Sequence, residues 1–512
     1  MNGADALITT LCDNGVEACF ANPGTSEMQF VSALDREPRM RPVLCLFEGV
    51  ATGAADGYGR IAGKPACTLL HLGAGYANGG ANLHNARRAA TPVVNVIGDH
   101  ATYHRQYDAP LNSDIAGWAA PNSLWVKSAE SADEVGPLAA EAVQASFGAP
   151  GGCASLILPA DSAWLETTVA GPVLERQPRP VTRRDEAEAI AARIKAAKKP
   201  VILMGGSCCS AAGVAAAGRI AATGVRVLID TFVARLARGE GRFAPDKMLY
   251  FGEMALADLE GVDLMVLVET VTPVAFFAYP DRPSVLVPEG CEEATLCGRE
   301  GDGPAALALL ADVVGAPEMG PAEPFDPPAK PQGKLGPYEI GASISRHMPG
   351  DAIISDDAVT AGLPIYTQTK SARAHDWLML TGGAIGQGIP VAIGAAVAAP
   401  DRKVLSLNGD GAAMYTVQGL WTIAREALDV TTVIFANHAY RILNIELGRT
   451  GAGNPGPAAK RLLDLGSPRI DWVALGQSLG IASERCETAE AFDAAMERAM
   501  TGKGPRLIEA AL

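Results

Sequence analysis

VLSLNGDGAAMYTVQGLWTIAREALDVTTVIFANHAYRILN, residues 404–444, contains two short apolar runs separated by a longer segment of helical period. The runs at 404–407 and 431–436 have the length and composition of buried strands. Between them, apolar side chains from Val417 to Leu428 recur at the spacing of one helix face. We therefore predict a βαβ unit, in which the crossover connection makes the two strands parallel neighbours.

Polar side chains follow both predicted strands. Gly409, Asp410 and Gly411 form a tight turn after the first strand, and Asn437 follows the second. The carboxyl ends of neighbouring parallel strands meet at one edge of the sheet, where open α/β sheets bind ligands. Carboxylate and amide oxygens suit Mg²⁺, and glycines let backbone N–H groups approach phosphates closely. The alternative is an ordinary Asp-Gly turn followed by a strand-ending Asn.

The spacing of this motif, GDG followed by 25 residues and then Asn, resembles the signature of thiamin diphosphate (ThDP) enzymes. The resemblance implies that Mg²⁺ is held by the side chains of Asp410 and Asn437 and by the carbonyl of Ala439. The family usually carries two consecutive Asn residues here, whereas this chain has Ala436 before Asn437. The departure is small, because one side-chain amide is enough for the metal.

A glycine-rich segment, LTGGAIGQGIP at 380–390, matches another part of the same family. In ThDP enzymes it carries a bulky aliphatic residue that supports the bent cofactor, and that residue here is Ile385; the alternative is a simple core position. The full set of cofactor-binding residues that the resemblance implies is Glu48, Ile385, Gly386, Gly409, Asp410, Gly411, Ala412, Asn437 and Tyr440.

Glu48 follows a predicted strand at 42–47 and precedes a helix of small residues. An acid at this place can simply favour the helix dipole. Between an apolar strand and a Gly/Ala helix it also loses solvent, which suits a carboxyl group that transfers protons. The run FEGVATGAADGYGRIAGKP at 47–65 closely resembles the glutamate motif of ThDP enzymes. This implies that Glu48 hydrogen-bonds the aminopyrimidine ring and activates the cofactor.

His71 ends a predicted strand at 66–70, where a histidine is well placed to move protons, although a lone His is more often structural. The runs ANPGTSEMQF and LHLGAGYANGGANLHNA resemble the benzoylformate decarboxylase branch of the family. That resemblance implies catalytic roles for His71, as acid and base, and for Thr25. Ser26 is expected to cap the next helix. A second His of this branch is replaced by Ala278.

Two proline-rich linkers, at 171–185 and 316–337, separate three segments in which helical and strand patterns alternate. We predict an α/β protein of three similar-sized, doubly wound parallel-sheet domains. By the resemblance these are a pyrimidine-binding domain at 1–170, a central domain at 186–315 and a diphosphate-binding domain at 338–512.

The central domain is expected to carry strands at 200–204, 225–229, 264–268 and 284–287. Gly205 and Gly206 after the first of these could cradle a phosphate or form a plain turn. In the family this domain sometimes carries FAD or ADP, but the sequence itself does not support FAD.

Composition limits the function further. The 512 residues carry a formal net charge of −15, which argues against a nucleic-acid or anionic-membrane partner. The ten cysteines show no CxxC spacing and suit reduced thiols. No basic, apolar leader opens the chain, and no apolar run reaches the roughly 20 residues of a membrane span. We expect a soluble cytoplasmic protein.

The family resemblance implies a decarboxylase of 2-oxo acids, with or without carboligase activity. The alternative is an acetolactate-synthase-like carboligase, although residues 109–114 replace the Phe-Gln-Glu run of those enzymes. A ThDP-binding protein without activity is disfavoured because the Glu and metal motifs are both retained. An NAD-dependent dehydrogenase is disfavoured because no GxGxxG fingerprint is present. The family builds its active site between subunits, so a homodimer or homotetramer is expected.

Overall fold

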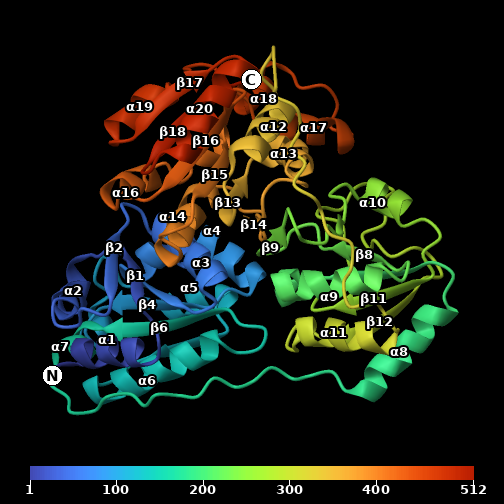
Figure 1. Cartoon of the computed structure of the whole chain (residues 1–512). Coiled ribbons are helices and arrows are strands. Elements are labelled where there is room, and N and C mark those ends of the chain that lie inside the picture. Colours follow the sequence, from blue (N-terminus) through green and yellow to red (C-terminus); the bar gives the residue numbers. More distant parts are fainter.

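Three β-sheets, each covered by helices, organise the computed structural model, which describes all of residues 1–512 (Figure 1). The predicted fold of three α/β units with parallel sheets is confirmed. The extended segment between α7 (Ala160–Trp164) and α8 (Arg184–Ala196) has no regular secondary structure and joins the first unit to the second. None of the helices combines the length and apolarity that crossing a bilayer requires.

The first sheet has six parallel strands in the order β2-β1-β3-β4-β6-β5. Its strands are β1 (Ala18–Ala21), β2 (Arg41–Leu44), β3 (Ala66–Leu70), β4 (Val93–Asp99), β5 (Trp125–Ser128) and β6 (Cys153–Pro159). The helices of this unit are α1 (Gly3–Asp13), α2 (Met28–Leu34), α3 (Glu48–Ala62), α4 (Leu72–Ala89), α5 (Ile115–Ala119), α6 (Ala132–Ser146) and α7, with 3-10 turns η1 (Thr25–Glu27), η2 (Arg105–Tyr107) and η3 (Ala120–Asn122).

The second sheet has five parallel strands in the order β10-β8-β7-β11-β12. They are β7 (Pro200–Met204), β8 (Arg226–Ile229), β10 (Asp246–Lys247), β11 (Leu264–Val268) and β12 (Glu292–Cys297), with helices α8, α9 (Ala211–Ala221), α10 (Gly252–Asp258) and α11 (Gly303–Val313) and the 3-10 turn η4 (Gly206–Cys209). The strand predicted at 284–287 is wrong, because that run forms only an isolated bridge through Val285. The strand that takes this place, β12, lies at the sheet edge, so its exposed glutamates concealed it from the apolar pattern.

The third sheet has seven strands in the order β17-β18-β16-β15-β13-β14-β9. They are β9 (Leu236–Arg238), β13 (Ala352–Asp357), β14 (His375–Leu378), β15 (Val404–Gly409), β16 (Val430–Ala436), β17 (Ala482–Cys486) and β18 (Arg506–Ala511). The helices are α12 (Pro337–His347), α13 (Gly362–Gln368), α14 (Gly388–Ala398), α15 (Asp410–Ala413), α16 (Gly419–Arg425), α17 (Arg441–Arg449), α18 (Pro457–Leu463), α19 (Trp472–Ser478) and α20 (Ala489–Thr501), with the 3-10 turn η5 (Val359–Ala361).

One strand of the third sheet comes from the central part of the chain. β9 pairs antiparallel with β14, so that Arg238 lies opposite His375. The sequence did not predict this strand, which is only three residues long. It ties the central segment to the edge of the third sheet.

Helices α3 and α14 pack with their backbones almost in contact. A Cβ on Gly394 would lie 1.8 Å from the carbonyl oxygen of Ala54, and one on Gly57 would lie 2.1 Å from that of Val391. Only glycine allows backbones to approach so closely. The small residues of the two helices therefore fix the first unit against the third.

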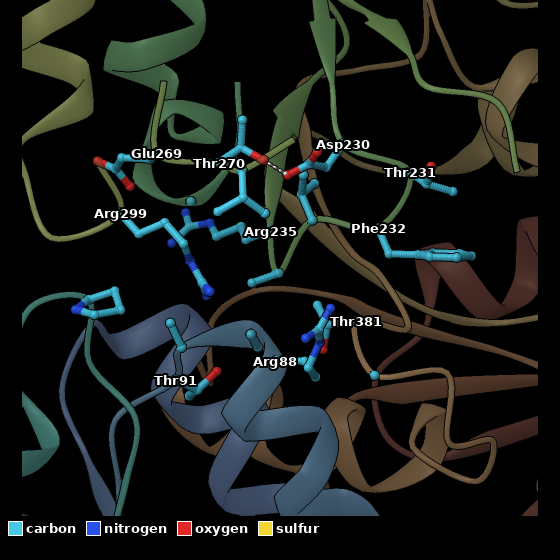
Figure 2. A pocket seen from close by; sticks show the side chains of 18 of the residues that line it. Arg88, Thr91, Asp230, Thr231, Phe232, Arg235, Glu269, Thr270, Arg299 and Thr381 are labelled. Carbon is cyan, nitrogen blue, oxygen red and sulfur yellow. Dashed lines mark hydrogen bonds between the residues drawn. The ribbon is translucent and has the colours of Figure 1, made fainter. Parts of the chain in front are cut away.

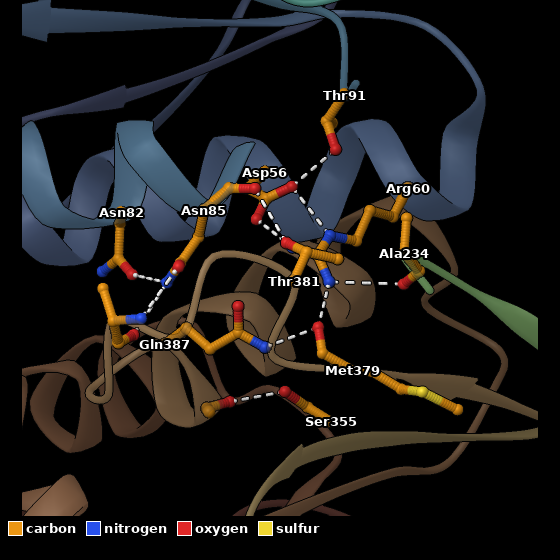
Figure 3. Close-up of polar contacts among 12 residues, drawn as sticks. Asp56, Arg60, Asn82, Asn85, Thr91, Ala234, Ser355, Met379, Thr381 and Gln387 are labelled. Atoms are coloured by element: carbon orange, nitrogen blue, oxygen red, sulfur yellow. Dashed lines mark hydrogen bonds and ion pairs between the residues drawn. The ribbon is translucent and has the colours of Figure 1, made fainter. Parts of the chain in front are cut away.

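A buried polar network strengthens the same contact (Figure 3). Arg60 on α3 forms a salt bridge of 2.5 Å with Asp56 and donates to the carbonyls of Met379 (2.7 Å) and Ala234 (3.2 Å). Asn85 on α4 donates to the carbonyl of Ala384 at 2.8 Å. Because main-chain carbonyls accept these bonds, the network holds the segment before α14 in one position.

Candidate active site

The predicted metal residues lie together at the carboxyl ends of β15 and β16. These strands are parallel neighbours, as predicted, with Gly409 opposite Phe435. The Asp410 carboxylate accepts hydrogen bonds from the N–H groups of His438 (2.7 Å) and Gly411 (2.8 Å). Asn437 Oδ1 accepts from the Ala439 N–H at 3.0 Å. The βαβ unit thus brings its carboxylate and its amide to one edge, although its crossover helix, α16, is shorter than the sequence indicated.

These oxygens fit a divalent cation. Asp410 is 3% exposed, and burial raises the pKa of its carboxyl group against the lowering effect of the two N–H donors. A nearby cation would restore the ionised form. The oxygens of Asp410 and Asn437 each accept one hydrogen bond, which leaves a second lone pair for a metal.

The turn after β15 is enclosed on one side by an aromatic ring. A Cβ on Gly411 would lie 2.4 Å from Cε1 of Tyr440, so the close approach of the ring requires glycine there. Ala412 is buried beside it in α15. Burial raises the pKa of the Tyr440 hydroxyl. Tyr440 and the GDG turn are therefore in direct contact. They can contribute to one cofactor-binding surface, as predicted for both.

Gly386 lies in the turn before α14, one residue after the half-buried Ile385. Its φ of +98° is left-handed, and its N–H donates to Asp357 Oδ2 at 2.7 Å. Asp357 also accepts from the Gly388 N–H at 3.2 Å, and burial raises the pKa of its carboxyl group to about 7. Asp357 is the last residue of β13, and its carboxyl group holds this turn.

Glu48 lies in the first unit as the first residue of α3 and is 6% exposed. Asn78 of α4 donates to its Oε2 at 3.0 Å. The expected burial of Glu48 at the start of a small-residue helix is therefore present, although the strand predicted at 42–47 is β2 (Arg41–Leu44), which ends three residues earlier and is partly exposed. Asn78 was missed, because only the packing of α3 against α4 shows that it faces Glu48.

His71 occupies the N-cap position of α4, where its side chain does not cap the helix but faces a second buried carboxylate. Its Nδ1 lies 2.9 Å from Glu27 Oε2 and 3.3 Å from Ser26 Oγ. Glu27 is 3% exposed, and it also accepts from the N–H of Gly24 at 2.7 Å and the hydroxyl of Ser26 at 2.6 Å. The predicted capping role of Ser26 is wrong, because Ser26 lies inside η1 and bonds Glu27 instead. Thr25 is exposed, and Ser26 rather than Thr25 contacts His71.

The predicted residues thus form two groups. The first contains Glu48 and His71 with their partners Asn78 and Glu27, and it belongs to the first sheet. The second, at the third sheet, contains Ile385, Gly386, Gly409, Asp410, Gly411, Ala412, Asn437, Ala439 and Tyr440. No hydrogen bond or salt bridge within the chain joins a side chain of one group to the other.

Comparison with known proteins agrees with this division. The family model described as the N-terminal TPP binding domain of thiamine pyrophosphate enzymes matches residues 1–118, which include the first group. The model described as the C-terminal TPP binding domain matches residues 362–510, which include the second. The chain belongs to the ThDP-dependent enzymes. Thiamine pyrophosphate is another name for ThDP, so the predicted family is confirmed.

Two relatives within this enzyme family match almost the whole chain. "Putative acetolactate synthase large subunit IlvX" of Mycobacterium tuberculosis is 50% identical over 99% of this chain and 98% of the relative. Benzoylformate decarboxylase of Pseudomonas aeruginosa is 26% identical over 97% of this chain and 96% of the relative. The family includes both decarboxylases and acetolactate synthases, so this ThDP-dependent enzyme is a decarboxylase or a carboligase.

Solved structures show the same fold. The ThDP-dependent 4-hydroxybenzoylformate decarboxylase of Rhodococcus jostii superposes with a TM-score of 0.87 at 23% identity, covering 99% of this chain and 98% of that one. Benzoylformate decarboxylase of Polynucleobacter necessarius superposes with a TM-score of 0.84 at 22% identity, covering 100% of this chain and 99% of that one. The three-sheet arrangement is therefore that of ThDP-dependent enzymes.

Proposed function

We propose that this ThDP-dependent enzyme is a decarboxylase of 2-oxo acids of the benzoylformate decarboxylase type. The supporting observation is that Glu48 and His71 lie close together, next to Gly75 in α4. A Cβ on Gly75 would lie 3.2 Å from Glu48 Oε1 and 3.4 Å from His71 Cβ, so the Glu48 carboxylate and the base of the His71 side chain both lie beside this glycine. A proton-carrying imidazole beside the cofactor-activating carboxylate suits a reaction that ends by protonating its product.

The binding roles follow from the two groups of residues. Asp410, Asn437 and the Ala439 carbonyl would hold Mg²⁺, and the N–H groups of the GDG turn would face the diphosphate. Ile385 would support the cofactor from the turn before α14. When bound, ThDP supplies a nucleophilic carbon for the substrate carbonyl and an electron sink for the loss of CO₂.

Glu48 would hold a proton at the aminopyrimidine ring, and its bond from Asn78 fixes the direction of the carboxyl group. His71 would hold one proton on Nδ1, where Glu27 accepts it at 2.9 Å. Nε2 is then the nitrogen that exchanges a proton with the substrate. Thr25, exposed beside Ser26, remains a candidate for contact with the substrate.

A second candidate is an acetolactate-synthase-like carboligase. The support is the name of the relative that is 50% identical over 99% of the chain. Ala278 stands where the benzoylformate branch carries its second His, so our proposal leaves the side chain of the substrate open. In a carboligase a second carbonyl compound would take the place of the final proton.

The deciding experiment measures CO₂ release and identifies the product from purified protein with ThDP and Mg²⁺. Benzoylformate, pyruvate and branched 2-oxo acids are supplied in parallel. An aldehyde as the main product supports the decarboxylase, and acetolactate from pyruvate supports the carboligase. If none of them releases CO₂, benzoylformate, pyruvate and branched 2-oxo acids are excluded as substrates, and either proposal would then require a 2-oxo acid with a different side chain.

We also propose that the enzyme is at least a homodimer with active sites between subunits. Large apolar side chains are exposed beside both groups of site residues: Leu46 (46%) and Met28 (49%) near the first, and Met414 (41%) and Tyr415 (53%) near the second. Exposed apolar side chains of this kind suit burial against another protein surface.

Ten free thiols, nine of them buried, fit a reducing compartment such as the cytoplasm.

A further inference from the structure

A cavity of about 710 Å³ lies where the central sheet meets the other two units (Figure 2). Asp230, Glu269 and Thr270 lie along one wall, and Arg88 and Thr91 lie on the opposite wall. The first wall is formed at the carboxyl ends of β8 and β11, where open parallel sheets bind ligands. If this domain carried FAD or ADP, as some ThDP enzymes do, the diphosphate would be expected at the glycine turn after β7.

That turn is already occupied by an anion of the chain itself. Glu269, which follows β11, directs its carboxylate into the turn and is 5% exposed. Its Oε2 accepts the N–H of Ser207 at 2.6 Å, and its Oε1 accepts the N–H of Gly303 at 2.7 Å. The Ser207 hydroxyl donates to Oε1, and Arg179 Nη1 lies 3.4 Å from it. We refer to these donors, from Ser207, Gly303 and Arg179, as the anion cradle.

The glycines around the anion cradle are needed by this carboxylate. A Cβ on Gly206 would lie 2.2 Å from Glu269 Oε2, and one on Gly303 would lie 2.6 Å from Oε1. The two glycines therefore make room for Glu269 itself. The phosphate-cradling turn considered from the sequence does hold an anion, but that anion is covalently part of the protein.

The backbone of Glu269 shows that its position depends on these contacts. Its φ of +48° lies in the left-handed region, which residues other than glycine rarely adopt. Such a conformation persists where the surrounding structure fixes it. A diphosphate would compete for the same N–H donors and would place a like charge against the carboxylate, which is unfavourable in a buried site.

We propose that Glu269 is a built-in anion that closes the anion cradle of the central domain, so that this enzyme binds neither FAD nor ADP there. Replacing Glu269 by glycine empties the cradle and opens it to a diphosphate. The proposal is independent of the reaction proposed above, because the central domain can exclude the nucleotide whichever product the enzyme forms.

The test compares the wild-type holoenzyme with Glu269→Gly, which removes the carboxylate and accepts the φ of +48° without strain. Calorimetric titrations use ADP, FAD and inorganic pyrophosphate. We expect no binding to the wild type. The variant should bind one ADP per chain, with a Kd at least about tenfold below the weakest Kd that the titration can detect. ADP should also raise the melting temperature of the variant and leave that of the wild type unchanged.

Asp281→Gly is the matched control, because Asp281 is an exposed acid with a φ of +57° in the same domain but outside the cradle. It should behave as the wild type does. If Glu269→Gly does not fold, Glu269→Asn removes the charge and shortens the side chain with a residue that tolerates the left-handed φ of +48°, and the same binding is expected. Stoichiometric flavin or ADP on the wild type would overturn the proposal, and so would a folded Glu269 variant that binds neither ADP nor pyrophosphate.

Discussion

The imidazole of His71 lies against a carboxylate that is 44 positions away in the sequence. Glu27 holds Nδ1 from a buried position, in the way that a buried acid fixes the tautomer of a catalytic histidine. A Cβ on Gly98 would lie 1.8 Å from Glu27 Oε1, so the neighbouring strand leaves room for this acid only because it carries glycine there. The pair is therefore built by the packing of the first unit itself.

We expect Glu27→Gln to lower kcat about tenfold, which corresponds to ~1.4 kcal/mol of activation free energy, while the affinity for ThDP stays the same. The amide keeps the size of the side chain but can present an N–H group to Nδ1, which favours the wrong tautomer. Steady-state kinetics and ThDP titration measure the two quantities. Glu17→Gln, at an exposed acid of the same unit, is the control. An unchanged kcat would remove Glu27 from this role.

The buried carboxyl group of Asp357 makes stability depend on pH. In the folded chain burial raises its pKa from 3.8 to about 7. Between these values the folded state binds the proton and the unfolded state does not, so this contribution to stability falls as the pH rises from about 4 to 7. Asp357→Asn cannot ionise and should keep its stability over that range.

Melting temperatures of the wild type and Asp357→Asn between pH 5 and 8 check this expectation. The melting temperature of Asp357→Asn minus that of the wild type should increase as the pH rises. Asp281→Asn, at an exposed acid, should show a difference from the wild type that does not vary with pH. A constant difference for Asp357→Asn would show that the carboxyl group ionises normally in the folded chain.

At the scale of elements, the contact between α3 and α14 depends on glycine. We expect Gly394→Ala to lower the melting temperature by at least about 3 °C, because overpacking a tight contact costs roughly 1–3 kcal/mol. The added methyl group would meet the Ala54 carbonyl at 1.8 Å. Differential scanning calorimetry measures the change. Gly80→Ala on α4 is the control, because a Cβ on Gly80 would meet nothing within 4 Å. It should leave the melting temperature unchanged or raise it. Equal effects at both positions would show that backbone contact is not the cause.

The sequence predicted those elements whose pattern is local. The strands of the 404–444 unit are apolar runs buried within the third sheet, and their order and direction were correct. β12 was missed because an edge strand alternates exposed and buried residues, and its glutamates do not form an apolar run. β9 was missed because three residues are too short for any period, and its partner β14 follows more than 130 residues later.

The same limit applies to the site. Asp410 and Asn437 could be found because each follows a strand with a recognisable motif, and Glu48 because it begins a helix whose small residues form another. Glu27 and Glu269 could not, since both act through contacts between segments far apart in the chain. A buried acid in a turn has no sequence pattern that distinguishes it from an exposed one.

At the scale of the whole molecule, the two groups of site residues predict complementation between defective subunits. Glu48→Gln alone should bind ThDP but exchange its C2 proton at least about tenfold more slowly, and Asp410→Ala alone should lose Mg²⁺-dependent ThDP binding. If each site combines Glu48 of one subunit with Asp410 of another, an equimolar mixture of the two variants, dissociated and reassembled, should recover about a quarter of the wild-type activity.

The recovery is measured as CO₂ release after mixing, with the oligomeric state followed by light scattering. Each variant dissociated and reassembled alone is the control and should show no more than about a tenth of the wild-type activity. No recovery from mixed, correctly assembled oligomers would mean that each chain builds its own complete site.

The strand β9 also bears on how such chains can be recombined. Exchanging the central segment between relatives at the two linkers would also exchange β9, which covers the edge of the third sheet at β14. Arg238 on β9 also stacks on Tyr366 in α13, with its Cζ 3.6 Å from the centroid of the ring. A foreign segment would therefore bring a foreign edge strand to the sheet that carries Asp410. The central domain is therefore not structurally independent of the third sheet, because its own β9 completes the edge of that sheet at β14.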